Sequence, residues 1–433
     1  MDRNKFYRIR EELHRHPELS GQEKHTIQYI RQVLQEFQPS RIHPLEKGHG
    51  LVAEYSFPGE GPTLLFRADI DAVAIAEKSP LPYCSENPGI AHKCGHDGHT
   101  TMLLMLAGFL YDHPLERGRI LLLFQPAEEN GQGAQLVLQD PWFRQQKIDR
   151  AFALHNLPGY PFSTIICRTG SFTCSVISCT ITFTGKTAHA AEPEKAVSPT
   201  APLLHILHLS ESWNRGTLKD PDYFRTTLIE LHIGEEAYGV AAGSGLIRLT
   251  LRAASEKILQ KHRQQLEQFV QQTIDSHPAL LCSIEWTEPF AANENDPESV
   301  TWIQEAAKSN GLVYEETDHP FAWGEDFGLF TQHIPGAMFG LGAGISTPAL
   351  HTPDYDFPNN ILQNGARMFY ELALITQLSE QVLTITIKSW LIPLNVFSNN
   401  HTNPPNKSII KVSPSPLHNL PYPCIFSILH KKP

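Results

Sequence analysis

Residues 91–110 read AHKCGHDGHTTMLLMLAGFL. An apolar segment of good helix formers without proline closes this stretch, which predicts a helix. Four side chains that can bind a metal ion precede the helix: His92, Cys94, His96 and His99. Because side chains alternate between faces in an extended segment, Cys94 and His96 can point at one ion. The stretch therefore predicts metal ligands at a loop-to-helix junction, and the rest of the chain must supply the other ligands.

The composition is typical of a soluble globular protein. The chain has 433 residues, of which 41% are hydrophobic and 19% are charged. Single cores stop growing well before this length, so we expect two domains. The formal net charge of -11 and the lack of a run of Lys and Arg argue against a nucleic-acid partner.

The N-terminal sequence and the cysteines predict a cytoplasmic location. MDRNKFYRIREELHRHPELS is charged throughout and lacks the apolar centre of a secretory signal. No stretch approaches the roughly 20 apolar residues of a membrane span, so we expect no membrane partner. Seven scattered cysteines do not form a disulfide framework, and a reducing compartment would protect a thiol that binds metal. Five are expected to be packing residues: Cys84, Cys167, Cys174, Cys179 and Cys282.

Short apolar runs alternate with helical stretches over much of the chain. The runs are LVAEYSF, TLLFRADID, RILLLFQPAEE, AFALHNLP and GAMFGLGAG. This alternation predicts an α/β domain with a buried, mostly parallel sheet flanked by helices. Residues 4–37 are expected to form a helix that breaks near HPELS, where Ser20 and Glu23 would form a capping box for the restart.

The pattern changes between about residues 175 and 287. SVISCTITFTG, TTLIELHIG, GLIRLTLRA and LLCSIEWTE read as strands, and helices are expected over TAPLLHILHLSESW and residues 257–276. Two helices on one antiparallel sheet are typical of a ferredoxin-like α+β domain. The residues from about 380 onward are rich in Asn, Ser and Pro without a period. We therefore predict a catalytic domain over 1–174 and 288–380, an inserted domain over 175–287, and a poorly ordered tail over 381–433.

Ligand-type side chains recur where predicted strands end. In sheets of this type, ligand and catalytic groups gather beyond the carboxyl ends of the strands. Taken singly, the acids could be a solvated helix start and the histidines ordinary core or surface residues. Taken together, they predict one site at one edge of the sheet. The residues are Asp69, Asp71, Glu128, Glu129, His155 and, in the later loop LHTPDYDFP, His351.

The adjacent acids Glu128 and Glu129 can divide two tasks of amide hydrolysis. One carboxylate can bind an ion, and the other can take a proton from water and pass it to a leaving amine. His189, in GKTAHAAEP, lies within the inserted domain, away in sequence from the ligands. It is either a turn histidine or a hydrogen-bond donor that reaches across a cleft to a developing oxyanion.

Eight motifs make the chain similar to a known superfamily. It resembles the aminoacylase and glutamate-carboxypeptidase superfamily of dinuclear metallohydrolases, in particular the amidohydrolase branch. This branch contains hippurate hydrolases, indole-acetyl-amino-acid hydrolases and N-acetyldiaminopimelate deacetylases. The motifs run in order from about residue 6 to residue 378. They are LHRHPELSGQE, FRADIDAVAIAE, HKCGHDGHTTMLL, LLFQPAEENGQGA, ALHNLPG, GKTAHAAEP, GEDFGLF and LHTPDYDFP.

The resemblance implies a site for two divalent metal ions. The ions would be zinc or manganese, with cobalt and nickel tolerated by such ligands. Carried over motif by motif, it implies that Cys94 is a ligand shared by both ions. His92 and His99 then have supporting or structural roles. The other implied ligands are His96, Glu129, His155 and His351.

The resemblance also implies the remaining roles. Glu128 would be the general base, and Asp69 or Asp71 would support the ligands. The inserted domain would be a lid that forms a homodimer. His189 of the lid would stabilise the tetrahedral intermediate, in its own subunit or in the partner's.

The chain departs from the family pattern in two places. Gly239-Val240-Ala241-Ala242 stands where relatives have Asn-Val-Ile-Pro, so an amide expected near the substrate carboxylate is missing. Asn359 and Asn360 stand where acidic residues are usual. Arg252 keeps the place of an arginine whose forked donors suit a free carboxylate, although a surface strand arginine is an equal reading.

These inferences predict metal-dependent hydrolysis of N-acyl amino acids, which releases a carboxylic acid and a free amino acid. A dipeptidase or carboxypeptidase with the same two metals is the alternative, and it differs only in the acyl half of the substrate. A catalytically silent homologue that binds a small carboxylate or a protein partner is the third reading.

Overall fold

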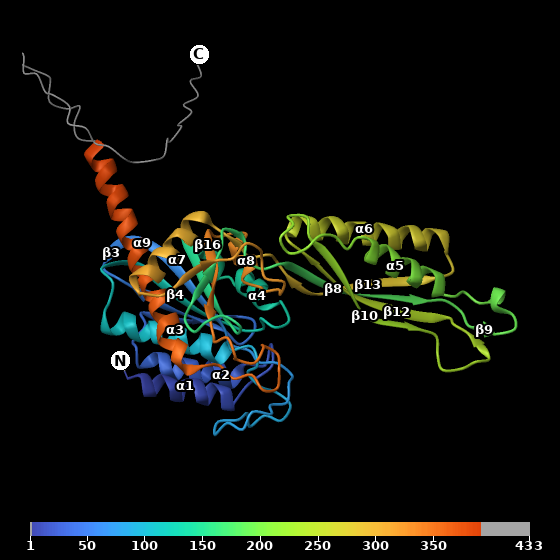
Figure 1. The fold of residues 1–433 in the computed structure, drawn as a ribbon, viewed down its shortest axis with the longest axis horizontal. Helices are drawn as coiled ribbons and strands as arrows, with labels where there is room; N and C mark the ends of the chain where they lie inside the picture. The colour runs from blue at the N-terminus through green and yellow to red at the C-terminus, as the bar shows by residue number, and fades with distance from the viewer. Residues whose placement is uncertain (1, 391–433) are drawn as a thin grey trace, which may run out of the picture. The chain divides into compact units, whose positions relative to one another are not determined.

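The computed structural model describes residues 2–390, and its largest unit is an eight-stranded sheet (Figure 1). The strand order is β1-β2-β4-β3-β5-β16-β6-β15. The strands are β1 (Arg41–Pro44), β2 (Leu51–Ser56), β3 (Gly59–Asp69), β4 (Arg117–Gln125), β5 (Arg150–Leu157), β6 (Ile165–Cys167), β15 (Tyr314–Glu316) and β16 (Gly336–Gly342).

The central strands of this sheet are parallel. β4, β3, β5 and β16 pair in parallel, as do β6 and β15, whereas β1, β2 and the β16–β6 pair are antiparallel. Crossover helices cover both faces of such a sheet, so its strands are buried on both sides. Leu64 and Phe66 of β3 join one core, and Leu65 between them joins another. The predicted α/β fold class is confirmed.

Helices from distant parts of the chain share the faces of the sheet. Residues of α1 (Arg3–Arg15), α2 (Lys24–Gln35), α3 (His96–Asp112), α7 (Pro297–Ser309) and α9 (Leu362–Trp390) belong to the core that includes Leu64 and Phe66. Residues of α4 (Gly133–Gln139), α8 (Gly328–Thr331) and η1 (Phe143–Gln145) belong to the opposite core. Among the helices of residues 2–390, none combines the length and apolar character needed to cross a membrane.

A second sheet has four antiparallel strands in the order β10-β12-β8-β13. In chain order, the elements alternate as β-α-β-β-α-β, which is the split pattern of ferredoxin-like domains. Both helices contribute to the core of this unit, with Leu203 and Ile206 from α5 and Leu259 and Leu266 from α6. The elements are β8 (Ser175–Thr184), α5 (Thr200–Ser212), β10 (Phe224–Ile233), β12 (Ser244–Ala253), α6 (Glu256–Ser276) and β13 (Leu281–Phe290). We keep the name inserted domain for β8 through β13.

Two small two-stranded pairs and two short 3-10 helices complete the described elements. β9 (Ala188–His189) pairs with β11 (Val240–Ala241), and β7 (Gly170–Ser171) pairs with β14 (Glu294–Asn295). The short helices are η2 (Pro193–Lys195) and η3 (Asn359–Ile361). The tail predicted for residues 381–433 begins inside α9, and residues 391–433 lie outside the described residues.

The capping box predicted for Ser20 and Glu23 is wrong. α2 begins at Lys24, immediately after Glu23. The Ser20 hydroxyl instead donates to Asp71 Oδ2 (2.7 Å). The Glu23 carboxylate accepts from the backbone N–H of Gly21 (2.9 Å) and of Ala127 (2.7 Å). The distant residues Asp71 and Ala127 therefore bind these two side chains, and the predicted cap does not form.

Candidate metal centre and active site

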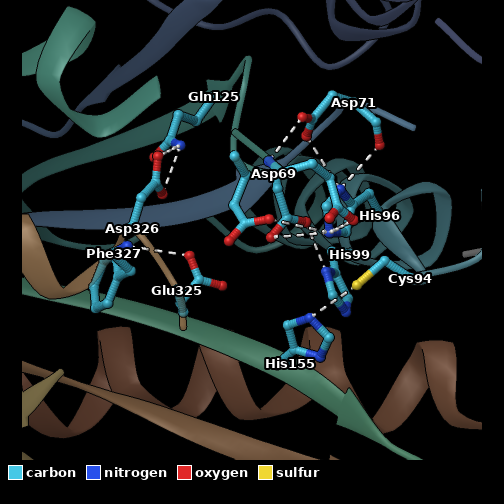
Figure 2. Close-up of polar contacts among 12 residues, drawn as sticks. Asp69, Asp71, Cys94, His96, His99, Gln125, His155, Glu325, Asp326 and Phe327 are labelled. Atoms are coloured by element: carbon cyan, nitrogen blue, oxygen red, sulfur yellow. Dashed lines mark hydrogen bonds and ion pairs between the residues drawn. The ribbon is translucent and has the colours of Figure 1, made fainter. Parts of the chain in front are cut away.

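The carboxyl ends of β3, β4 and β5 bring the predicted site residues together (Figure 2). Asp69 ends β3, Glu128 and Glu129 lie in the turn after β4, and His155 lies near the end of β5. His96 begins α3 at the same place. Its Nε2 lies 3.7 Å from Asp69 Oδ2, 3.9 Å from Glu128 Oε2 and 3.7 Å from Glu129 Oε1. The predicted convergence at one sheet edge is therefore present.

Cys94 and His96 approach each other through a bend rather than an extended segment. Gly95 between them has a φ of 103°, in the left-handed region that favours glycine. A Cβ at Gly95 would also lie 2.3 Å from Asn156 Oδ1, so a larger residue would clash. The prediction of an extended segment between Cys94 and His96 is therefore wrong, although the two side chains still lie close enough to face one ion. The candidate ligand atoms of Cys94, His96 and His155 all lie within 4.8 Å of one another.

A second group of candidate ligands also includes Cys94. Ligand atoms of Cys94, Glu129 and His351 lie within 4.8 Å of one another. His351 Nε2 is 3.4 Å from Glu129 Oε1. The backbone N–H of His351 donates to the backbone carbonyl of Lys93 (2.7 Å). The five predicted ligands thus form two overlapping groups, and the thiol belongs to both.

The atoms in these groups fit a bound cation. His96 Nε2 and Glu129 Oε1 are buried, 3.7 Å apart, and neither has a hydrogen-bond partner among the described residues. Burial, together with the charges of Glu129 and Glu128, raises the pKa of the Cys94 thiol well above its usual range. A divalent cation would bind the free nitrogen and oxygen and would favour the thiolate. The donor set therefore matches a metal site.

Asp71 orients two of the candidate ligands. His96 Nδ1 lies 2.9 Å from the Asp71 carbonyl oxygen and 3.2 Å from Asp71 Oδ1, which directs Nε2 toward the site. The backbone N–H of Glu129 donates to Asp71 Oδ2 (3.0 Å). Although burial acts in the opposite direction, hydrogen bonding with His96 lowers the pKa of Asp71. Asp71 therefore contacts two of the predicted ligands, His96 and Glu129.

Asp69 and His99 form a similar support. His99 Nδ1 lies 2.7 Å from Asp69 Oδ1, and His99 Nε2 lies 2.6 Å from the Asn156 side-chain oxygen. Both ring nitrogens of His99 thus face protein groups. The ligand atoms of Asp69, His96 and His99 also lie within 4.8 Å of one another, so the supporting role of His99 stays a prediction.

Glu128 differs from its neighbour Glu129. It is buried, and burial together with the charge of Glu325 raises its pKa well above the usual range. A carboxylate with a raised pKa holds an accepted proton more readily, which suits a group that takes a proton and returns it.

Comparison with known proteins places the chain in a family. Residues 65–375 match the model of peptidase family M20/M25/M40. The chain belongs to this family. It is 32% identical over 371 residues to an N-acetyl-L-cysteine deacetylase of Bacillus subtilis strain 168, a match that covers 84% of this chain and 86% of that protein. It is 30% identical over 362 residues to an N-acetyldiaminopimelate deacetylase of Bacillus velezensis, covering 82% and 95%.

The structures of M20/M25/M40 members agree with this placement. A Bacillus subtilis dinuclear metal binding peptidase from the M20 family superimposes with a TM-score of 0.73 at 26% sequence identity, covering 87% of this chain and 98% of that one. The family resemblance predicted from the motifs is confirmed.

Two residues predicted for the family site do not join the metal groups. His189 is exposed in β9, where its Nδ1 accepts from the N–H of Ala191 (3.0 Å). The ten-residue strand β8, which precedes it, spans about 33 Å. Arg252 is partly buried and donates to the carbonyl of Ala322. His189 belongs to no candidate ligand group of the described residues.

Some residues around the candidate site had no role predicted from the sequence. Asn156 donates from Nδ2 to the hydroxyl of Tyr355 (2.6 Å) and binds His99 on its other side. Arg67 is fully buried and donates to Asp69, Glu325 and Asp326. The motif GEDFGLF contains Glu325 and Asp326, so the sequence marked the segment but not its function.

Proposed function

We propose that this chain is a metal-dependent amidohydrolase that cleaves N-acyl amino acids into a carboxylic acid and a free amino acid. The observation that carries the proposal is the pair of overlapping ligand groups that share Cys94, with the buried Glu128 beside them. The relatives named as deacetylases of N-acetylcysteine and N-acetyldiaminopimelate support this substrate class.

Glu128 moves the proton in the proposed reaction. Its carboxylate takes a proton from the attacking water and delivers it to the nitrogen of the leaving amine. Asp71 holds His96 and the backbone of Glu129. Asp69 holds His99, which contacts Asn156, and the Asn156 carbonyl oxygen lies 2.9 Å from His155 Nδ1.

Two divalent ions would be held by the predicted ligands. When bound, they would supply Lewis-acid chemistry, polarising the amide carbonyl and lowering the pKa of water. Thiolate, imidazole and carboxylate ligands favour zinc or manganese and tolerate cobalt or nickel. A reducing cytoplasm would keep the Cys94 thiol available. The proposed ligands are Cys94, His96, Glu129, His155 and His351.

The inserted domain, over residues 175–287, is proposed as a lid that forms a homodimer. β10 is an edge strand of its sheet, and Leu228 and Ile229 of β10 are 40% and 60% exposed. An exposed apolar edge strand is a natural pairing surface. From the lid, His189 would donate a hydrogen bond to the developing oxyanion, and Arg252 would receive the substrate carboxylate.

A substrate panel tests the proposed function. Protein loaded with zinc or manganese is given N-acetyl and N-benzoyl amino acids, with N-acetylcysteine and N-acetyldiaminopimelate among them, and a matched set of dipeptides. We expect hydrolysis of acyl amino acids with at least tenfold higher kcat/KM than of dipeptides. A preference for dipeptides would favour the dipeptidase alternative. Protein that binds two ions and leaves every substrate intact would overturn the proposal.

Cys94→Ser tests the shared ligand separately. Loss of both the second ion in elemental analysis and most of the turnover is expected. Full metal content and activity would contradict the proposed role of the thiol.

A further inference from the structure

The turn that carries Glu128 needs support from outside itself. It spans residues 126–132, between the end of β4 and the start of α4. Ala127 within it has a φ of 54°, which a residue with a side chain adopts only when its surroundings enforce it. The internal hydrogen bonds of the turn include Gly131 N–H to the Glu128 carbonyl (2.8 Å) and Gly133 N–H to the Ala127 carbonyl (2.9 Å). From outside the turn, Glu23 Oε1 accepts from the backbone N–H of Ala127 (2.7 Å) and Asp71 Oδ2 accepts from that of Glu129 (3.0 Å). The position of the Glu128 carboxylate depends on these two bonds and on how the two ends of the turn are held.

One buried carboxylate binds both ends of this turn. The Gln125 Nε2 group, just before the turn, donates to Asp326 Oδ1 (2.9 Å) and Oδ2 (2.8 Å). The backbone N–H of Ala134, just after the turn, donates to Asp326 Oδ2 (2.8 Å). Figure 2 shows Asp326 facing the Gln125 amide. Asp326 thus joins the last residue of β4 to the first turn of α4.

The two ends are in close contact where Asp326 binds them. A Cβ at Gly133 would lie 1.9 Å from the Pro126 carbonyl oxygen and 2.5 Å from Gln125 Nε2. Only glycine allows this crossing of the chain. A small movement of either end would therefore be passed on to the turn between them.

Arg67 anchors Asp326 to the rest of the site. Its guanidinium donates to Asp326 Oδ1 (2.7 Å), to Gln125 Oε1 (3.0 Å) and to Asp69 Oδ2 (2.7 Å). Asp69 in turn contacts His99. Asp326 is therefore linked both to the turn of the proposed base and to the supports of the metal ligands.

The contacts define the state and the role of Asp326. Burial raises the pKa of Asp326 to about 8, although the charge of Arg67 acts in the opposite direction. The groups of Gln125, Ala134 and Arg67 that bind its oxygens are all donors. An ionised carboxylate satisfies all of these donors. Oxygens of Asp326, Glu325 and Glu128 also lie within 4.8 Å of one another, as in a cation site. Arg67 already supplies the cation bonded to Asp326 and Glu325, so a metal ion is not required there.

We propose that Asp326 is a positioning residue that clamps both ends of the Glu128 turn. It touches neither substrate nor metal, and it acts by fixing where the Glu128 carboxylate lies. The proposal rests on the proposed function for its effect on turnover, but its effect on the turn is independent of any substrate.

Three variants test the clamp. Asp326→Asn keeps the size of the side chain but turns one acceptor into a donor that faces other donors. Asp140→Asn is the matched control, because Asp140 is buried at the other end of α4 and accepts from the N–H groups of Glu46, Trp142 and Phe143. The double variant Gln125→Glu with Asp326→Asn reverses the direction of the Gln125 bond and restores both the link and the charge.

Kinetics give the first measurement. We expect Asp326→Asn to lower kcat at least tenfold, with KM within twofold of the wild type and two ions still bound. Asp140→Asn should keep kcat within twofold, and the double variant should regain at least a third of wild-type kcat. If Asp326→Asn does not fold, Gln125→Met, which removes the link from β4 to Asp326 together with the bond from Arg67 to Gln125 Oε1, is expected to lower kcat about threefold to tenfold.

Hydrogen exchange gives the second measurement, which needs no substrate. Amides of residues 126–134 should exchange at least tenfold faster in Asp326→Asn, or in Gln125→Met, and at the wild-type rate in Asp140→Asn and the double variant. Faster exchange in a protein that hydrolyses no acyl amino acid would support the clamp and overturn the proposed function. An active wild type whose variants at positions 326 and 125 keep normal kcat and exchange would overturn the clamp.

Discussion

The edge of the large sheet and the tip of the inserted domain both hold residues proposed for catalysis, but they hold them in opposite ways. At the sheet edge, Asp69, Asp71 and His96 are completely buried, and each is bonded to other site residues. At the tip, His189 is exposed beside Val240, which is 48% exposed, and Tyr238 nearby is fully exposed.

The difference separates residues that other residues of the site already hold from residues that need another surface to hold them. Buried, mutually bonded groups cannot reorganise when substrate arrives, which is the condition for preorganised electrostatic catalysis. An exposed histidine in a two-residue strand acquires a fixed partner only when substrate or another protein surface covers it. We therefore expect changes at the edge to alter chemistry or stability strongly, and changes at the tip to alter turnover without altering stability.

The largest effect is expected from Glu128→Gln. If Glu128 moves the proton, kcat should fall about 10³-fold, because a positioned general base contributes roughly 10²- to 10⁴-fold. The protein should keep two ions per chain, since Glu128 lies outside the predicted ligand set. Steady-state kinetics with an acyl amino acid and elemental analysis check both points. A loss of less than tenfold would assign the base elsewhere, and a catalytically silent binder would show no change in ligand affinity.

A pH-dependent loss of stability is the next effect, and it should belong to the sheet-edge region. His14 Nδ1 lies 2.8 Å from Asp97 and Nε2 lies 2.9 Å from Glu77. Burial lowers the pKa of His14, but the hydrogen bonds to Asp97 and Glu77 outweigh it and raise the pKa to about 9. Because the folded value lies above the unfolded one, this stabilisation is complete below about pH 6.5 and disappears as the pH rises through about 9.

Urea unfolding at pH 6 and pH 9.5 measures the His14 contribution. The free energy of unfolding should fall by on the order of 3 kcal/mol more in the wild type than in His14→Gln between these pH values. Equal pH dependence in the two proteins would show that folding does not raise the pKa of His14.

The same contrast explains how much of the fold the sequence predicts. The long apolar runs correspond to β2, β3, β4, β5 and β16, because a buried strand of six or more residues leaves a clear pattern. β6 and β15 have three residues each and leave no period. Ser20 and Glu23 satisfy a local capping pattern, yet Asp71 and Ala127 compete successfully for their side chains. Local rules fail where tertiary partners offer better bonds.

The candidate site also contains residues that the sequence pattern predicts and residues that depend on tertiary partners. The ligands could be predicted because thiol, imidazole and carboxylate groups stand out by type at strand ends. The clamp could not, because Asp326 is an ordinary acid until it meets Gln125, which lies 201 positions away in the sequence. Its role exists only in the folded chain.

His189→Ala tests the tip. Removal of one donor to an oxyanion typically lowers kcat about 10²- to 10³-fold, and we expect about 10²-fold here. The free energy of unfolding should stay within about 0.5 kcal/mol of the wild type, because the side chain is exposed. Kinetics and urea unfolding together separate the two effects. An unchanged kcat would return His189 to the role of a turn histidine.

The smallest effect on folding is expected from Ile229→Thr in the edge strand β10. Ile229 sits at a break in the pairing of β10 with β12 and is 60% exposed, so the free energy of unfolding should change by less than about 0.5 kcal/mol. Ile345→Thr is the control, because Ile345 is 70% exposed and lies outside the inserted domain. If lids pair through β10, Ile229→Thr should weaken the dimer at least tenfold in sedimentation, and the control should not.

Activity on dilution then decides which subunit His189 serves. If His189 completes the partner's site, the kcat of Ile229→Thr should fall as the dimer dissociates, with the midpoint seen in sedimentation. If it serves its own subunit, kcat should be independent of concentration, although the dimer still dissociates. A variant that stays dimeric would exclude this edge as the interface. In each case a change at an exposed position of the inserted domain alters assembly or turnover and leaves the buried edge intact, which is the distinction that the two regions imply.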